Sequence, residues 1–376
     1  MDEQTLNRRQ ILGGLTAASA AGLVGGVASG KAAAAPAPDV GLSQAPTITD
    51  VKEKIAYVTG GSSGIGLGIA RVFHEAGMKV VIGYLNDLHI GAALKHFPAN
   101  DPRVYPIKHD VMERDSWERV ADDIEKRFGT LHVLVNNAGA GMRAPASTGT
   151  YKDWEWGLGL HLWGPIYGIH TYVPRMLAGK QGSQIVTTTS TSGILPGSGA
   201  GIYTVTKIAQ VGLMEELRLE LQHTNIGTSA FIPGLTRTNI GQSESYRPEA
   251  LENSGPPAAA PGAQPRRARG PGRRQPLRFP QFDGGSGGPA AARPMDPVVA
   301  GRFVLDGILH NDLYIVAEPE YRVGVEARCN ALLDSMIPFK PLPARLTNSS
   351  HLYRTPIYMQ EIAHRKATQK REIQGI

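Results

Sequence analysis

The sequence predicts an α/β fold built as one doubly wound domain, with a seven-stranded parallel sheet and helices on both faces. Two observations lead to this fold class. From Lys52 onward, short runs with strand character alternate with longer runs of helical periodicity. The strand-like runs are continuously apolar, as expected for strands covered on both faces. In such folds the crossovers are right-handed and ligands bind beyond the carboxyl ends of the strands.

The predicted elements follow in strict order along the chain. The first strand, KIAYVTG at 54–60, leads into an amphipathic helix at 64–77 that ends at Gly77. The further strands are expected at 78–84, 103–110, 131–139, 183–190 and 226–234, and the further helices at 116–129, 156–179 and 203–222. A last helix and a seventh strand are expected within 296–319. The helical part of 156–179 is unusually apolar, which suits a helix packed on the sheet.

Composition sets the class of protein. At 376 residues, of which 41% are hydrophobic, the chain can bury a large core, and α/β folds often extend to about 250 residues as one unit. The single cysteine, Cys329, excludes an internal disulfide and a cysteine-rich metal site, so we expect a buried thiol. No metal site is predicted.

The N-terminus resembles a bacterial twin-arginine (Tat) export signal. Arg8 and Arg9 precede a weakly apolar, Gly- and Ala-rich stretch at 11–29, followed by small residues that suit signal-peptidase cleavage. We therefore expect a signal peptide at 1–34, a linker at 35–50, and an exported protein, periplasmic or secreted, with no stable membrane span after cleavage. A disordered leader of a cytoplasmic protein and an uncleaved anchor are the alternatives, although the glycine-rich run makes a poor transmembrane helix.

The net charge of +6 is a local property of the chain. Its excess arginines lie between 266 and 278, inside a Pro/Gly/Ala/Arg-rich segment at 254–293 that lacks apolar periodicity. We expect this segment to be a disordered insertion within a domain at 51–335. The arginines lack interleaved aromatic residues, so we expect no specific nucleic-acid partner. Residues 336–376 form a C-terminal extension, read as an extended arm and a short basic helix.

A glycine-rich turn joins the first strand to the first helix. In YVTGGSSGIGLGIA, Gly60, Gly64 and Gly66 allow a tight turn, close approach of backbone to a pyrophosphate, and close packing of helix on strand. An anion would meet free N–H groups at the positive end of the helix. The spacing differs from Gly-x-Gly-x-x-Gly, and a glycine turn without a ligand is the alternative.

Tyr203 and Lys207 stand four positions apart, on one face of a predicted helix. By itself this pair is better explained by an ordinary turn of a buried helix than by a proton-transfer site. Other motifs change that interpretation: Thr59–Gly66, Asp110–Val111, the NNAG of 136–139, Ser190 thirteen residues before Tyr203, and the PGLTRT of 233–238. Together they resemble the classical short-chain dehydrogenase/reductase family over about residues 50–335, which implies a Rossmann-like fold.

The resemblance implies an NAD(P)-dependent oxidoreductase that transfers hydride between nicotinamide and a secondary alcohol or ketone. Tyr203 would be the general acid/base, Lys207 would lower its pKa and hold the ribose, and Ser190 would donate a hydrogen bond to the reacting oxygen. Ser192 competes with Ser190 for this role, but the position of Gly193 favours Ser190. The implied cofactor-binding residues are Thr59, Gly60, Ser62, Ser63, Gly64, Ile65, Gly66, Tyr84, Asp110, Val111, Asn137, Ala138, Gly139, Tyr203, Lys207, Pro233, Gly234, Thr236 and Thr238.

Two departures from the family pattern leave questions open. His161 stands where the family usually has an Asn that seats a water linking the lysine to solvent, so the histidine could rebuild that proton relay, shuttle protons itself or simply pack. We expect His161→Asn to retain or raise activity. Tyr84 stands where NAD-dependent members usually have Asp, which favours NADP, although Leu85 supplies no cation.

The substrate and the assembly are predicted only by class. The family's substrate loop corresponds to NIGQSESYRPEALENSG, residues 239–255. Ile194, Leu195 and Met142 near the catalytic residues favour a hydrophobic alcohol or ketone. The resemblance also implies a homodimer or homotetramer built on the two long helices. The alternative function is a dinucleotide-binding sensor or scaffold with impaired catalysis.

Overall fold

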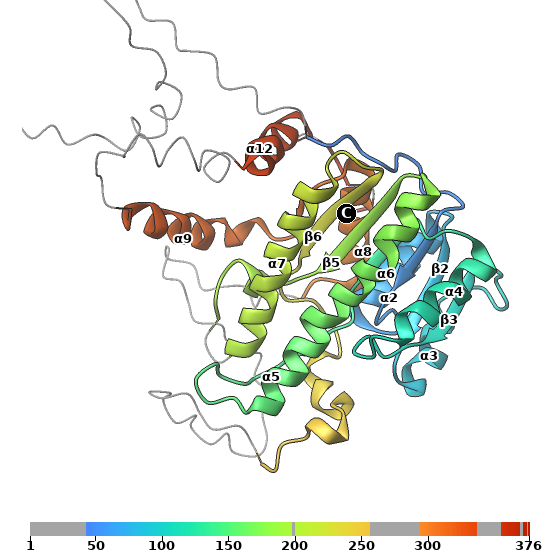
Figure 1. Ribbon diagram of the computed structural model, residues 1–376, viewed down its shortest axis with the longest axis horizontal. Helices are drawn as coiled ribbons and strands as arrows, with labels where there is room; N and C mark the ends of the chain where they lie inside the picture. The colour runs from blue at the N-terminus through green and yellow to red at the C-terminus, as the bar shows by residue number, and fades with distance from the viewer. Residues whose placement is uncertain (1–42, 198–199, 256–293, 337–354, 369–370, 374) are drawn as a thin grey trace, which may run out of the picture.

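The computed structural model describes residues 43–197, 200–255, 294–336, 355–368, 371–373 and 375–376. Its centre is one sheet of seven parallel strands in the order β3-β2-β1-β4-β5-β6-β7 (Figure 1). The strands are β1 Ile55–Val58, β2 Lys79–Tyr84, β3 Val104–Lys108, β4 Val133–Asn136, β5 Ser183–Thr188, β6 Ile226–Ile232 and β7 Tyr314–Val316. The predicted fold class is confirmed. The strand order reverses between β1 and β4, and this reversal opens a crevice at their carboxyl ends.

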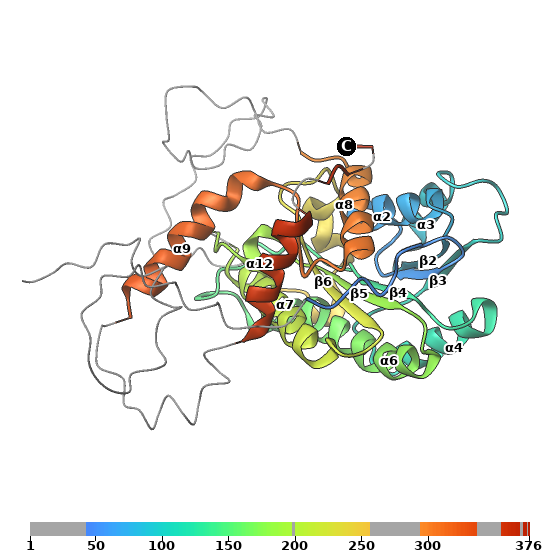
Figure 2. The ribbon, with the colours of Figure 1, turned by 90° about the horizontal axis from the view of Figure 1, so that it is seen from above.

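Helices cover both faces of the sheet, as Figure 2 shows from above. Helices α2 (Gly64–Glu75), α3 (Asp87–Leu94) and α8 (Pro297–His310) lie on one face, and α4 (Ser116–Phe128), α6 (Gly164–Gly179) and α7 (Gly201–Leu221) lie on the other. Each face has its own buried apolar cluster, one around Phe73 and Ile82 and one around Trp117 and Leu134. Both clusters use alternate residues of the same apolar strands, which explains why those strands read as continuous apolar runs.

The long helix predicted at 156–179 is not regular. It begins earlier, as α5 (Tyr151–Leu158), because Thr150 and Asp153 form a reciprocal capping box. A π-helical turn, η1 (Gly159–Trp163), then separates α5 from α6. In an α-helix the carbonyl of residue 161 would accept from the N–H of residue 165, and Pro165 has no N–H. The proline therefore accounts for a wide turn at His161. Helix α3 was not predicted, because its eight residues are too few to show a clear period.

The ends of the predicted domain are more ordered than the sequence indicated. The predicted signal peptide at 1–34 and nearly all of the insertion lie outside the described residues, but part of the predicted linker is described and packs on the domain. Gln44 donates hydrogen bonds to the carbonyls of Leu221, Thr224 and Ile226, and Ile48 is buried. None of the described helices is long and apolar enough to cross a membrane.

The C-terminal part contains two helices beyond β7. Helix α9 (Arg322–Asp334) projects from the domain, and its residues are exposed or half-buried (Figures 1 and 2). Cys329 lies on it and is exposed, so the prediction of a buried thiol was wrong. Helix α12 (Pro356–Thr368) packs back toward α7. Asp312, buried beside β7, holds it through an ion pair with Arg365 and a hydrogen bond with the His364 ring.

Candidate active site

A cavity of about 290 Å³ opens at the carboxyl ends of the central strands. Its wall contains most of the residues predicted to bind the cofactor or act in catalysis. These are Gly60, Ser62, Ser63, Gly64, Ile65, Asp110, Asn137, Ala138, Gly139, His161, Ser190, Tyr203, Lys207, Pro233, Gly234, Thr236 and Thr238. They come from segments almost 180 residues apart in sequence, and the parallel sheet brings them together because all its strands end at one edge.

The glycine-rich turn has the conformation that its sequence predicted. Gly60 and Gly64 have positive φ angles of 61° and 51°, which side chains with a Cβ rarely adopt. A Cβ on Gly66 would lie 2.4 Å from the carbonyl oxygen of Gly60, so only glycine fits there. The Thr59 hydroxyl accepts from the N–H groups of Asn137, at 2.9 Å, and Ala138, at 3.0 Å. The turn and the segment after β4 are thereby held as one unit.

Four predicted cofactor residues do not line the cavity. Thr59 and Gly66 support the glycine turn from beneath, as described above. Val111 is buried against α6, where a Cβ on Gly164 would meet its side chain at 3.1 Å. Tyr84 ends β2 outside the cavity wall, and the next two residues, Leu85 and Asn86, line the wall instead. The sequence located the end of this strand, but the exit angle of the chain decides which side chain faces the crevice.

The predicted catalytic triad of side chains meets at one wall. Tyr203 and Lys207 lie one turn apart on α7, with the Lys207 Nζ 5.5 Å from the centre of the Tyr203 ring. Burial raises the pKa of Tyr203, and a hydrogen bond from Ser190 acts in the opposite direction. Burial also lowers the pKa of Lys207 to about 7. Ser190, and not Ser192, lines the cavity beside Tyr203.

Lys207 is held by neutral partners. Its Nζ donates to the Thr188 carbonyl at 3.0 Å and to the Gln210 Oε1 at 2.9 Å. None of the ion pairs among the described residues includes Lys207. Its ammonium is therefore positioned by dipoles, which leaves its charge available to the cavity.

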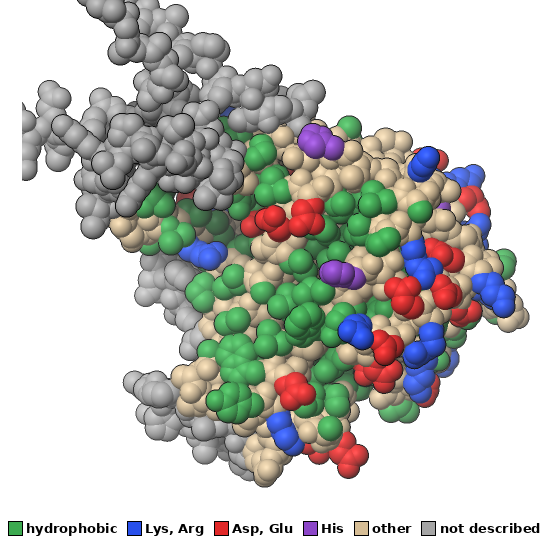
Figure 3. All heavy atoms as spheres, viewed as in Figure 1, with side chains coloured by type: hydrophobic (Ala, Val, Ile, Leu, Met, Phe, Trp, Pro, Cys, Tyr) green, Lys and Arg blue, Asp and Glu red, His purple; other side chains and the backbone are tan. Residues whose placement is uncertain are grey.

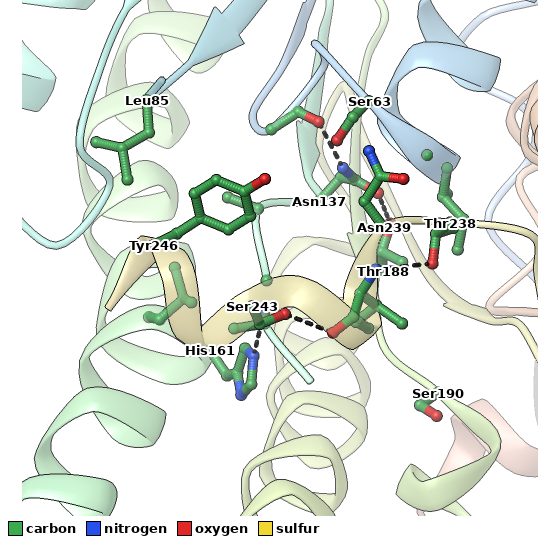
Figure 4. A pocket seen from close by; sticks show the side chains of 18 of the residues that line it. Ser63, Leu85, Asn137, His161, Thr188, Ser190, Thr238, Asn239, Ser243 and Tyr246 are labelled. Atoms are coloured by element: carbon green, nitrogen blue, oxygen red, sulfur yellow. Dashed lines mark hydrogen bonds between the residues drawn. The ribbon is translucent and has the colours of Figure 1, made fainter. Parts of the chain in front are cut away.

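His161 is fully buried beneath this wall, on the π-helical turn (Figure 4). Its Nε2 accepts from the Ala140 N–H at 3.0 Å, and its Nδ1 lies 3.1 Å from the Thr206 hydroxyl, which itself donates to the Tyr203 carbonyl. An accepting Nε2 requires the neutral Nδ1–H tautomer. Burial, followed by the Lys207 charge, lowers the pKa of His161 well below its usual value. Both ring nitrogens are engaged in structural bonds, so the geometry favours packing and bonding over proton shuttling.

A short segment after β6 covers the cavity. We call residues 240–253 the lid; it includes the 3₁₀ turns η3 (Ile240–Tyr246) and η4 (Glu249–Leu251). Figure 4 shows η3 crossing the cavity, with the Tyr246 side chain extending from it into the cavity. The Ser243 hydroxyl accepts from the Gly141 N–H at 2.8 Å, and the Tyr246 hydroxyl lies 2.9 Å from the His89 Nε2 on α3.

The lid also carries a buried ion pair. Arg247 bonds the Asp153 carboxylate at 2.6 Å and stacks over the Trp156 ring at 4.8 Å. Since Trp156 lines the cavity, the lid and this part of the wall are fixed together.

Several wall residues were missed by the sequence analysis. They are Asn86, His89, Met112, Ala140, Trp156, Leu160, Thr188 and Thr189. Five other wall residues, Asn239, Ile240, Ser243, Tyr246 and Pro248, lie in the substrate loop that the resemblance implied at 239–255. The three apolar neighbours that the sequence analysis named, Ile194, Leu195 and Met142, are not among the lining residues. Apolar side chains do line the wall, but they come from other segments, among them Met112 after β3, Trp156 on α5, Leu160 on the π-turn and Ile240 of the lid.

Comparison with known proteins agrees with this geometry. Residues 54–248 match the family model described as short chain dehydrogenase. The C alpha-dehydrogenase of Sphingobium sp. (strain NBRC 103272 / SYK-6) is 30% identical over 295 residues, which are 78% of this chain and 90% of that protein.

Solved structures give the same picture. A short chain dehydrogenase/reductase from Burkholderia phymatum in complex with NAD superposes with a TM-score of 0.65 at 25% identity, covering 78% of this chain and 99% of that one. A putative short-chain dehydrogenase from Novosphingobium aromaticivorans superposes with a TM-score of 0.64 at 27% identity, and the match covers 84% of this chain and 99% of that one. With the fold, the motifs and these matches in agreement, the chain belongs to the short-chain dehydrogenase/reductase family of oxidoreductases.

Proposed function

We propose that the protein is an NAD(P)-dependent oxidoreductase that interconverts a hydrophobic secondary alcohol and its ketone. One observation carries the proposal: Ser190, Tyr203 and Lys207 share one cavity with a glycine turn whose conformation suits a pyrophosphate. The residues present fit the dinucleotide, because the N-terminus of α2 faces the cavity through Ser62, Ser63 and Gly64. When bound, the nicotinamide supplies or accepts the hydride.

The protein's own groups handle the proton and the developing charge. Tyr203 gives its phenolic proton to the carbonyl oxygen during reduction and takes it back during oxidation. Ser190 donates a hydrogen bond to the same oxygen, which stabilises negative charge there. The Lys207 ammonium favours the phenolate of Tyr203 and so lowers its pKa toward the working range. Thr236 and Thr238, together with Asn137, Ala138 and Gly139, would hold the nicotinamide half.

For the cofactor, we propose that NADP is preferred over NAD. The wall at the end of β2 consists of Leu85 and Asn86, so it offers no carboxylate to repel a 2′-phosphate. Lys108, which pairs with Tyr84 in the sheet, donates to Asp87 at 2.6 Å instead of standing free for a phosphate, which keeps the preference small.

The substrate class and the assembly follow from the apolar surfaces. Met112, Trp156, Leu160 and Ile240 line the cavity and suit an apolar substrate body. Outside, Figure 3 shows apolar side chains gathered over α5, α6 and α7, where Trp163, Val205 and Ile208 are exposed. Such a patch supports a homodimer or homotetramer.

A Tat-type signal would export the folded enzyme with its cofactor already bound.

The decisive experiment uses purified mature chain, residues 35–376. Absorbance at 340 nm is followed with NAD or NADP and a panel of apolar secondary alcohols, and with the reduced cofactors and ketones. We expect turnover, and we expect Tyr203→Phe to abolish it while cofactor binding, measured by fluorescence, persists. A bound nucleotide with no turnover on any substrate would instead favour a sensor or scaffold.

A further inference from the structure

The side chain of Gln210 connects Lys207 on α7 to the π-helical turn that carries His161. It lies on α7, one turn after Lys207, and is only 1% exposed. Its Oε1 accepts from the Lys207 Nζ at 2.9 Å, and its Nε2 donates to the backbone carbonyl of His161. Both ends of the amide are thus used, so its orientation is fixed by the two bonds.

The His161 carbonyl is available for this bond because of the local sequence. Its partner in a regular α-helix would be the N–H of residue 165, which is Pro165. The π-turn turns this carbonyl toward α7, where Gln210 meets it. The histidine ring meanwhile ties the same turn to Ala140 and Thr206. The turn is therefore anchored by backbone and side chain together.

We propose that Gln210 is a positioning residue: its amide bridges the Lys207 ammonium to the His161 carbonyl and so keeps the ammonium charged and directed at Tyr203. An ammonium has three N–H donors. Two are taken by Thr188 and Gln210, which leaves the third for the cavity wall where Tyr203 lies. A neutral amide holds its protons, so this bridge does not pass protons onward through α6. Proton exchange at Lys207 then takes place from the cavity side.

The charge state of Lys207 depends on few neighbours. Among the residues that the structure describes, the titratable groups packed against it are Tyr203 on α7 and His161 on the π-turn, and His161 is held neutral by its own bonds. Removing the Gln210 oxygen takes away one of two acceptors that stabilise a buried ammonium. A hydrogen bond to a charged group shifts the equilibrium by about one pH unit or more. The titration midpoint of Lys207, the pH at which half of its side chains are charged, therefore falls when the hydrogen bond to Gln210 is removed.

The test compares Gln210→Met, which keeps the length of the side chain, with a matched control, Gln184→Met. Gln184 is equally buried but bonds Ser229 and Asn311, away from the cavity. Lysine ¹³Cε labelling of the chain, with the Lys207 signal assigned by its loss in Lys207→Met, gives the titration of Lys207 by NMR. We expect the midpoint to fall by about one pH unit in Gln210→Met and to stay unchanged in Gln184→Met. An unchanged midpoint in folded Gln210→Met overturns the proposal.

A second variant covers the case in which Gln210→Met does not fold. Gln210→Glu keeps an acceptor and adds a negative charge, so the Lys207 midpoint should rise; a constant or lower midpoint argues against the bridge. A third measurement, of enzyme turnover, rests on the proposed function, whereas the NMR titrations do not. There, kcat for alcohol oxidation at pH 7 should fall about fivefold in Gln210→Met, because fewer Lys207 side chains are charged, while the Kd for the reduced cofactor stays constant. If the parent protein turns over no substrate, the proposed function fails, and the NMR titration still decides the role of Gln210.

Discussion

Replacing Arg247 with Met should loosen the lid over the cavity. The Arg247 guanidinium is buried and bonds the Asp153 carboxylate and the Leu251 carbonyl, besides stacking on Trp156. Removing one partner of a buried ion pair costs about 3–5 kcal/mol. Asp153 keeps hydrogen bonds from the Thr150 N–H, at 2.9 Å, and from Asn253, at 2.8 Å, so its charge is not left without donors. We therefore expect the lower end of that range, about 3 kcal/mol.

Two measurements check this expectation. In Arg247→Met, the loss of unfolding free energy should lower the melting temperature by about 5–10 °C. Amide hydrogen exchange should speed up more within residues 240–253 than elsewhere in the chain. Arg322→Met is the matched control, since Arg322 makes an exposed pair with Glu326 on α9, and such pairs contribute less than about 1 kcal/mol. The reasoning is refuted if both variants melt alike and the lid exchanges at its original rate.

Two further predictions concern His161 and the C-terminal helix. His161→Asn should retain or raise activity, because the resemblance implies Asn at this position and the His161 ring nitrogens make structural bonds. The shorter Asn side chain gives up the bond from the Ala140 N–H and leaves a cavity, so the melting temperature should fall. A kcat loss above about a hundredfold, measured with stable protein, would contradict this. Burial raises the pKa of Asp312, but hydrogen bonds from His364 and Arg371 outweigh it and leave the pKa below its usual value. The stability that Asp312 contributes is therefore complete above the unfolded pKa of about 3.9 and is lost as the pH falls through the folded pKa. Helix α12 should resist pepsin near pH 4 and be released at lower pH, whereas in Asp312→Asn it should be released at both; identical digestion of the two proteins would rule out this anchor.

Much of the fold could be predicted from the sequence, because its signals are local. Continuous apolar runs identify strands buried on both faces, and Gly60 and Gly64 identify a turn with positive φ, since each property depends on residues adjacent in the chain. The serine, tyrosine and lysine were found through motif spacing, and the cavity brings them together. The exposure of Cys329 was missed, because composition does not show whether a helix has a neighbour to pack against.

The sequence by itself determined the order of the elements, the glycine turn and the residues that meet at the carboxyl edge of the sheet. The tertiary structure decided what lies between them: that Gln210 bridges Lys207 to the His161 carbonyl, and that Arg247 of the lid reaches Asp153 of α5. Those contacts join residues 49 and 94 positions apart. They depend on how α5, the π-turn and α7 pack together and on the path of the chain after β6. A local pattern cannot specify these contacts, because they are set by which elements lie side by side.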